Sequence, residues 1–229
     1  MLLNSIMAIA VLAAPNGLDY PETRRVDQVD VLHGTEVADP YRWLEGDVRN
    51  DREVSDWVDA QNVVTQGYLA SIPQRDAIRD RLGELWNYEK IRTPYRIGDR
   101  IYFSANSGLQ NQDVLYSRTD TEDGKVEVVL DPNTWSEDGT VALGGTSFSP
   151  DGRYLAYAVA DAGSDWKTWR IRDLSTGLDL PDEIKWSKFS TPAWMPDGSA
   201  FFYGRYDAPS DGAYVGRNEY MKLYRHVPG

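Results

Sequence analysis

The spacing of apolar residues along the chain changes near residue 88. Between residues 51 and 69, apolar side chains recur every three or four positions, with Asp, Asn and Gln among the residues between them. They are Val54, Trp57, Val58, Val64 and Tyr68. This spacing predicts one amphipathic helix from Asp51 to Leu69.

A second helix is predicted directly after the first. Residues 71–74 (SIPQ) have the form of a capping box, in which the Ser71 side chain accepts a hydrogen bond from the Gln74 backbone N–H and the Gln74 side chain bonds back. Pro73 then falls in the first turn, where its missing N–H costs nothing. We expect this helix to bury its apolar positions, which are Ile78, Leu82, Leu85 and Trp86.

Beyond residue 87 the pattern is typical of antiparallel strands and tight turns, with runs of Tyr, Phe, Val and Thr between Gly, Asp, Asn and Pro. Three segments resemble one another, at residues 98–105, 151–158 and 197–204. The second and third overlap a Pro-Asp-Gly turn, in which proline sets φ and glycine accepts a positive φ. The interval between these two turns fits the period of roughly 40–50 residues that indicates a β-propeller blade.

These patterns predict a mainly β fold, in which an N-terminal helical segment precedes the first two to three blades of an incomplete β-propeller. The expected domains are the helical segment at residues 15–87 and the propeller at residues 88–229. A single blade cannot bury both faces of its sheet, so each blade should pack on a neighbour. A closed propeller needs at least about four blades, so we expect the chain to be the opening part of a longer protein.

The first 14 residues are apolar for most of their length and end in small residues, as the core of a secretory signal does. No Lys or Arg precedes the apolar run, so an upstream extension without a signal function is the alternative. If residues 1–14 are a signal peptide, the protein is periplasmic or secreted; otherwise it is cytoplasmic. No other segment is long and apolar enough to predict a membrane span.

Composition excludes several classes of function. The chain carries 36 Asp and Glu against 24 Lys and Arg, a net charge of −12, which disfavours a nucleic-acid partner. It has no Cys, so disulfides, thiol nucleophiles and Cys-ligated metals are excluded. We expect no cofactor and no metal, because no phosphate-binding glycine motif or ligand spacing is present.

No catalytic residue is assigned within the chain. A serine hydrolase of the α/β type needs a Gly-x-Ser-x-Gly turn and a histidine base, and the 229 residues contain no such turn. The two histidines, His33 and His226, are interpreted as structural or surface residues. The aromatic stretch at residues 164–169 either packs within a blade or lines a ligand groove.

Ten motifs occur in order along the chain and together resemble the prolyl oligopeptidase family of serine peptidases. They are Tyr20-Pro-Glu-Thr, Val37-Ala-Asp-Pro-Tyr-Arg-Trp-Leu-Glu45, Trp57-Val-Asp-Ala-Gln-Asn62, Leu85-Trp-Asn-Tyr88, Gly108-Leu-Gln-Asn-Gln112, Leu130-Asp-Pro-Asn133, Ser136-Glu-Asp-Gly-Thr140, Ala162-Gly-Ser-Asp-Trp166, Lys188-Phe-Ser190 and Phe201-Phe-Tyr203. The resemblance runs from about Tyr20 to His226.

The resemblance implies a propeller inserted into an α/β-hydrolase domain, with the N-terminal helical segment packed on that domain. Members of this family hydrolyse short peptides after proline, and the propeller admits only small substrates. The chain would then be the N-terminal portion of such an endopeptidase. Its partners would be short proline-containing peptides and the α/β-hydrolase domain that these 229 residues lack, and it should be inactive alone.

Two residues match family positions that face the substrate. The resemblance implies that Phe189 offers an apolar surface to the peptide, and that the Asp165 carboxylate orients an arginine of the hydrolase domain. The alternatives are that Phe189 belongs to a blade core and that Asp165 bonds a neighbouring loop N–H. A rival function is a stand-alone blade module that binds peptides or another subunit. A sialidase-like, sugar-binding propeller is a third, which the helical segment does not fit.

Overall fold

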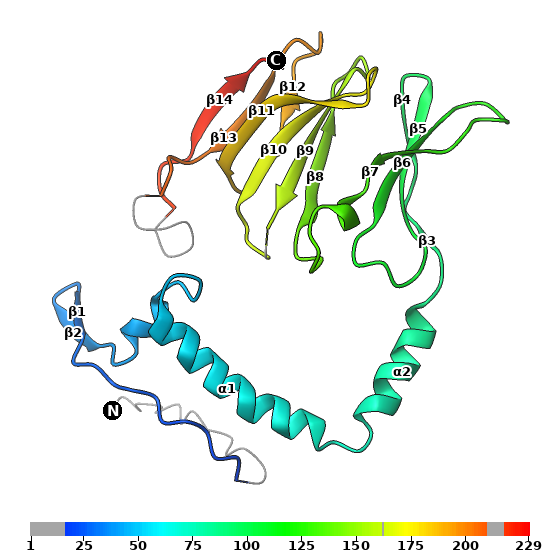
Figure 1. Cartoon of the computed structure of the whole chain (residues 1–229). Coiled ribbons are helices and arrows are strands. Elements are labelled where there is room, and N and C mark those ends of the chain that lie inside the picture. The colour runs from blue at the N-terminus through cyan, green and yellow to red at the C-terminus, as the bar shows by residue number, and fades with distance from the viewer. Residues whose placement is uncertain (1–16, 162, 210–217) are drawn as a thin grey trace, which may run out of the picture. The chain divides into compact units, whose positions relative to one another are not determined.

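The structure is a computed structural model that describes residues 17–161, 163–209 and 218–229. Contacts divide the chain into two compact units, residues 1–77 and 78–229, each of which is described by itself (Figure 1). The predicted signal, residues 1–14, lies outside the described residues. In the described part, no helix has the length and apolar character needed to cross a membrane.

The first unit contains a hairpin and a long helix. Strands β1 (Val29–Leu32) and β2 (Thr35–Ala38) pair antiparallel, and the turn between them places His33 and Gly34 at φ values of 53° and 83°. The short 3₁₀ helix η1 (Arg42–Glu45) leads to helix α1 (Arg52–Ala70). The first predicted helix is thereby confirmed to within one residue at each end.

Helix α1 begins where the Asp51 side chain caps it. The carboxylate accepts hydrogen bonds from the backbone N–H groups of Glu53 at 3.0 Å and Val54 at 3.3 Å, two donors that the helix itself cannot satisfy. Val54 is buried, and the Trp57 indole N–H donates to the Thr23 hydroxyl at 3.0 Å. The predicted apolar face therefore packs at its N-terminal end, whereas Tyr68 near the other end is 40% exposed.

The second helix, α2 (Arg75–Trp86), is present, but its predicted cap is wrong. Ser71 ends α1 instead, and its hydroxyl donates to the Tyr68 carbonyl at 2.7 Å. A Ser side chain can satisfy either end of a helix, so the sequence pattern alone does not decide between them.

The predicted burial of the apolar side of α2 is also wrong. Its four apolar side chains are between 53% and 62% exposed, and they are Ile78, Leu82, Leu85 and Trp86. Periodicity identifies which side of a helix is apolar, but it does not supply an element to cover that side. Helix α2 ends at Trp86 and the next strand begins at Lys90, whereas the division into compact units falls earlier, inside α2.

The second unit contains three antiparallel sheets in chain order (Figure 1). The first has β3 (Lys90–Ile91), β4 (Tyr95–Ile97), β5 (Arg100–Asn106), β6 (Val114–Thr119) and β7 (Glu127–Leu130), followed by the 3₁₀ helix η2 (Pro132–Thr134). The second has β8 (Ala142–Phe148), β9 (Tyr154–Ala160), β10 (Lys167–Asp173) and β11 (Leu178–Ser187). The third has β12 (Ala193–Trp194), β13 (Phe201–Arg205) and β14 (Lys222–His226). We call them blades 1, 2 and 3.

The predicted repeat is confirmed. Its three copies supply β5, β9 and β13, which occupy the same place in their blades. Both Pro-Asp-Gly turns close with a hydrogen bond of 2.9 Å, from the Gly152 N–H to the Ser149 carbonyl and from the Gly198 N–H to the Met195 carbonyl. The two glycines have φ values of 72° and 70°, a conformation that other residues adopt at a cost.

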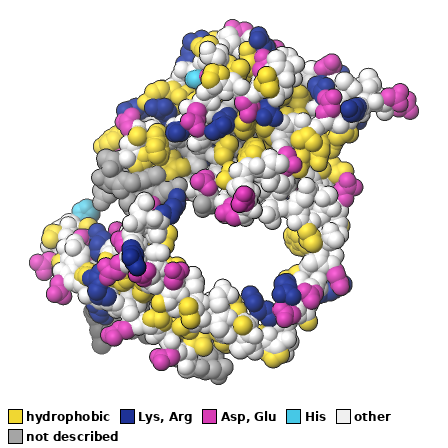
Figure 2. Space-filling model, viewed as in Figure 1, with side chains coloured by type: hydrophobic (Ala, Val, Ile, Leu, Met, Phe, Trp, Pro, Cys, Tyr) yellow, Lys and Arg dark blue, Asp and Glu magenta, His cyan; other side chains and the backbone are white. Residues whose placement is uncertain are grey.

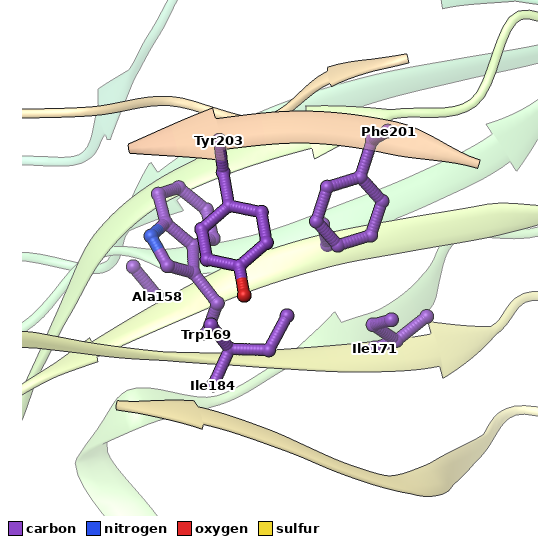
Figure 3. Close-up of a cluster of buried hydrophobic side chains, with 7 residues drawn as sticks. Ala158, Trp169, Ile171, Ile184, Phe201 and Tyr203 are labelled. Atoms are coloured by element: carbon purple, nitrogen blue, oxygen red, sulfur yellow. The ribbon is translucent and has the colours of Figure 1, made fainter. Parts of the chain in front are cut away.

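The blades pack on their neighbours, as expected for units that cannot bury both faces alone. Strand β9 has side chains on both faces: Leu155 and Tyr157 join a cluster with blade 1, whereas Ala156 and Ala158 join a cluster with blade 3. Figure 3 shows the second cluster, in which Phe201 and Tyr203 of β13 lie over residues of blade 2, among them Trp169 and Ile184. The fold is thus mainly β, with propeller blades that do not close.

Charged side chains are interspersed on the visible face of the molecule. Basic and acidic groups lie next to one another in Figure 2. Many of them form ion pairs, such as Arg100 with Glu127 at 2.6 Å and Arg92 with Asp113 at 2.9 Å. Exposed pairs of this kind contribute little to stability, so the blade clusters hold the second unit together.

Candidate functional site

The backbone is strained at two bulky residues, one near the end of β11 and one just after it. Trp186 and Phe189 have φ values of 64° and 50°, in the left-handed region that normally favours glycine. Each such residue costs about 1–3 kcal/mol and persists only where its surroundings fix it. We call residues 186–190 the Phe189 turn.

The Phe189 turn presents its phenylalanine to solvent. The Phe189 side chain is 79% exposed, so the alternative that it belongs to a blade core is wrong. The ring buries little apolar surface within the described residues, although its backbone is held in an unfavourable conformation. Strained residues of this kind are often found at ligand-binding sites, so the Phe189 turn is the first candidate for a functional surface.

Asp165 lies on the loop between β9 and β10, and this loop contacts the Phe189 turn through the next residue. Trp166 packs edge-on against Trp186 with ring centroids 5.6 Å apart, and the Lys188 ammonium lies 3.9 Å from the Trp166 ring centroid. Asp165 is exposed, and among the described residues its carboxylate has no hydrogen-bond partner. The alternative that it bonds a neighbouring loop N–H is therefore not supported.

The aromatic stretch at residues 164–169 divides between the two roles considered for it. Trp169 is fully buried in the cluster of blades 2 and 3. Trp166 instead helps to line a cavity of about 690 Å³, together with Trp135, Tyr157 and Trp186. A cavity of this volume is in the range of small-molecule and peptide side-chain sites. Neither Asp165 nor Phe189 lines it.

One wall of this cavity carries a buried tyrosine that is hydrogen-bonded to an exposed carboxylate. The Tyr157 hydroxyl donates to Asp179 at 2.9 Å, and Arg172 binds the same carboxylate at 2.7 Å. Burial, with the neighbouring carboxylate, raises the pKa of Tyr157 to about 12. Burial alone would raise the pKa of Asp179, but the hydrogen bonds from Arg172 and Tyr157 outweigh it and hold that pKa below its ordinary value.

We expect Tyr157→Phe to change how stability depends on alkaline pH. The folded state holds the Tyr157 proton more tightly than the unfolded state does, and this difference adds about 2–3 kcal/mol to the free energy of unfolding. The added stability is complete below pH 10 and is lost as the pH rises towards about 12. In urea unfolding between pH 8 and pH 12, the free energy of unfolding should fall less steeply with pH for Tyr157→Phe than for the unsubstituted chain.

The matched control for this prediction is Tyr88→Phe, because Tyr88 is 57% exposed. Its alkaline loss of stability should follow that of the unsubstituted chain. Equal slopes for all three proteins would show that the Tyr157 proton is not held by the fold.

Within residues 17–161, 163–209 and 218–229, the histidines and acidic residues form no recognisable metal centre. His226 Nε2 of blade 3 lies 2.6 Å from Asp182 of blade 2, and His33 occupies the tight turn of the hairpin. Both positions fit the structural roles expected for them. Among the described residues, no group of three or more His, Asp or Glu side chains is placed to hold a metal ion.

Sequence reasoning missed the residues that fix the Phe189 turn. Ser187 is fully buried, accepts from the Trp169 indole N–H at 3.2 Å and donates to the Gly204 carbonyl at 2.9 Å. The Gly204 N–H donates to the Ser190 hydroxyl at 2.7 Å. No local pattern marks these partners, because Gly204 follows the turn at a distance of many residues. The local sequence offers only two serines on either side of a Lys-Phe pair.

Residues 21–229 match the family model described as prolyl oligopeptidase, N-terminal beta-propeller domain. Among curated relatives, a prolyl endopeptidase of Elizabethkingia meningoseptica is 44% identical over 225 residues, which cover 97% of this chain and 31% of the relative. A dual function macrocyclase-peptidase of Amanita bisporigera is 39% identical over 82% of this chain and 29% of the relative. The chain thus spans about a third of the length of these proteins.

Solved structures agree with the fold. One from a study of two prolyl endopeptidases aligns with a TM-score of 0.80 at 36% identity, over 91% of this chain and 31% of that one. Prolyl oligopeptidase B from Galerina marginata, bound to a 35mer hydrolysis and macrocyclization substrate, aligns with a TM-score of 0.74 at 33% identity, over 91% and 32%. The chain therefore belongs to the prolyl oligopeptidase family and matches its N-terminal β-propeller region.

Proposed function

We propose that the chain is the propeller-bearing N-terminal portion of a serine-type endopeptidase that cleaves short peptides after proline. The observation that carries the proposal is the family match along residues 21–229, since its relatives include proteins named prolyl endopeptidases. A related structure holds a 35mer peptide, which supports a peptide as the substrate class. The propeller would limit the size of the peptides that reach the reaction site.

The Phe189 turn and the loop that carries Asp165 are the parts of the propeller that we expect to act on the substrate. Phe189 would offer its exposed ring to an apolar side chain of the peptide, where burial of both surfaces favours binding. The free carboxylate of Asp165 would pair with an arginine of an α/β-hydrolase domain and orient it towards the substrate. Contacts of Trp166 with Trp186 and Lys188 would keep the two loops in register.

The hydrolase domain would also cover the apolar side of α2. Its four exposed apolar residues form a stripe at helical spacing with no cover among the described residues. Such a stripe normally packs on another element. Because the 229 residues contain no Gly-x-Ser-x-Gly turn, we expect hydrolysis to need that domain.

The test is a comparison of two chromogenic substrates, an N-blocked Gly-Pro amide and the matched Gly-Ala amide. A polypeptide that joins these 229 residues to an α/β-hydrolase domain of the family should cleave the proline substrate about 100-fold faster or more in kcat/KM, a difference of about 2.7 kcal/mol. The 229-residue chain alone should cleave neither. Equal rates on the two substrates by the joined polypeptide would contradict the proposal, as would cleavage by the chain alone.

A further inference from the structure

The two serines that flank Lys188 and Phe189 bind one and the same residue of the neighbouring blade. Ser187 donates to the carbonyl of Gly204 at 2.9 Å, and Ser190 accepts from the N–H of Gly204 at 2.7 Å. Gly204 lies in β13, so both ends of the turn are fixed to a strand of blade 3. We call these two hydrogen bonds the serine clasp.

We propose that the serine clasp sets the position of the Phe189 ring, so that Ser187 and Ser190 are positioning residues for substrate contact at Phe189. The inference rests on the proposed function, because it takes Phe189 as a substrate contact. It goes further because it identifies the residues that hold Phe189 in place.

The strain in the turn shows why a clasp is needed. Trp186 and Phe189 both have positive φ, and a short loop with two such residues would relax to ordinary angles unless its ends were held. The hydrogen bond at the first end of the turn is buried, because Ser187 is fully inaccessible to solvent. Ser187 also accepts a hydrogen bond from the Trp169 indole N–H at 3.2 Å. Buried polar groups that lose a partner are costly, so this end has one favoured arrangement.

A glycine at the partner position leaves room for the clasp. A Cβ atom on Gly204 would lie 2.9 Å from the sulfur of Met221, whose flexible side chain is 53% exposed and can move aside, and 3.3 Å from the Ser190 hydroxyl oxygen. The second contact would displace the Ser190 hydroxyl by a few tenths of an ångström. A third hydrogen bond, from the Tyr206 N–H to the Trp186 carbonyl at 2.9 Å, continues the same attachment.

The position of Phe189 can be measured on the 229-residue chain without any substrate. The chain has five phenylalanines, so labelling with 4-fluorophenylalanine gives five ¹⁹F signals, and Phe189→Tyr identifies the one that belongs to residue 189. We expect Ser187→Ala and Ser190→Ala each to shift or broaden that signal. Ser190→Thr keeps the hydroxyl oxygen and should restore it.

The matched control is Ser149→Ala. Ser149 is also fully buried and hydrogen-bonded, to Asp151 at 2.6 Å, but it lies in the turn between β8 and β9. This variant should leave the Phe189 signal at its original position even if the chain becomes less stable. If Ser187→Ala does not fold, Ser190→Ala tests the clasp from its more accessible end.

The consequence for substrate is measured in the polypeptide joined to a hydrolase domain, with an N-blocked Gly-Pro amide. We expect each clasp variant to raise KM about 3- to 10-fold with kcat little changed. In a Phe189→Ala background the same serine substitution should have no further effect on KM. A general loss of stability would not produce that dependence.

The outcomes separate the two claims. A Phe189 ¹⁹F signal that is unmoved in both serine variants overturns the clasp, whatever the kinetics show. A moved signal with unchanged KM, where Phe189→Ala itself raises KM, overturns the link between the clasp and substrate binding. If Phe189→Ala leaves KM unchanged, the substrate role of Phe189 fails, and with it this part of the proposed function.

Discussion

Replacement of Phe201 by alanine should lower the free energy of unfolding by about 3–5 kcal/mol. Phe201 is fully buried in the cluster between blades 2 and 3 (Figure 3). Within blade 3, its ring centroid lies 4.8 Å from that of Trp194 and 5.2 Å from that of His226. Truncation removes the apolar surface that joins the blades and leaves a cavity that neighbouring rings cannot fill. Guanidinium unfolding followed by circular dichroism measures the loss.

The neighbouring residue provides the matched control. Phe202 occupies the other face of the same strand and is 40% exposed, so Phe202→Ala should cost less than about 1 kcal/mol. Equal losses for the two variants would mean that blade 3 is not held by its contact with blade 2. The packing of blade 3 on blade 2 would then not be a main source of stability in the second unit.

Replacement of Phe189 by alanine should have the opposite profile, with a large effect on activity and a small one on stability. In the polypeptide joined to a hydrolase domain, we expect kcat/KM for proline peptides to fall about 10- to 100-fold, the equivalent of one buried aromatic contact. Stability of the chain should be unchanged. Phe189→Gly should raise it by up to about 1 kcal/mol, because glycine accepts a φ of 50° without strain.

Leu178→Ala is the matched control for the kinetics. Leu178 is 68% exposed and begins β11, whereas the Phe189 turn follows the other end of that strand. Its kcat/KM should remain within about 2-fold of the unsubstituted protein, since exposed apolar residues away from a site are replaced with little effect. A Phe189→Ala variant that behaves like Leu178→Ala would remove Phe189 from the substrate surface.

Most of the fold could be predicted from local signals. The Pro-Asp-Gly turns at residues 150–152 and 196–198 occur at the same place in two blades. Proline and glycine favour this turn through their own backbone angles, so the signal is local. The same holds for the helix that begins after Asp51, where a capping side chain meets a helical apolar pattern. Blade stacking then follows from strands with apolar residues on both faces, as in β9.

The rest depends on contacts between distant parts of the chain. Ser71 caps α1 rather than α2, and the exposed side of α2 has an apolar pattern but no cover among the described residues. The serine clasp and the pair of Tyr157 with Asp179 each join two strands, so neither has a local signature. Phe189 and Asp165 could be named only through their match to a family, and their substrate roles stay predictions.

The most direct test of the substrate surface is a crystal structure of the 229 residues joined to a hydrolase domain, with a proline-containing peptide bound. We predict that the Phe189 ring lies within about 4.5 Å of the peptide, the range of a packing contact, and that Ser187 and Ser190 still bind Gly204. A peptide bound away from the Phe189 turn, with that ring still surrounded by water, would contradict the proposed role of this surface.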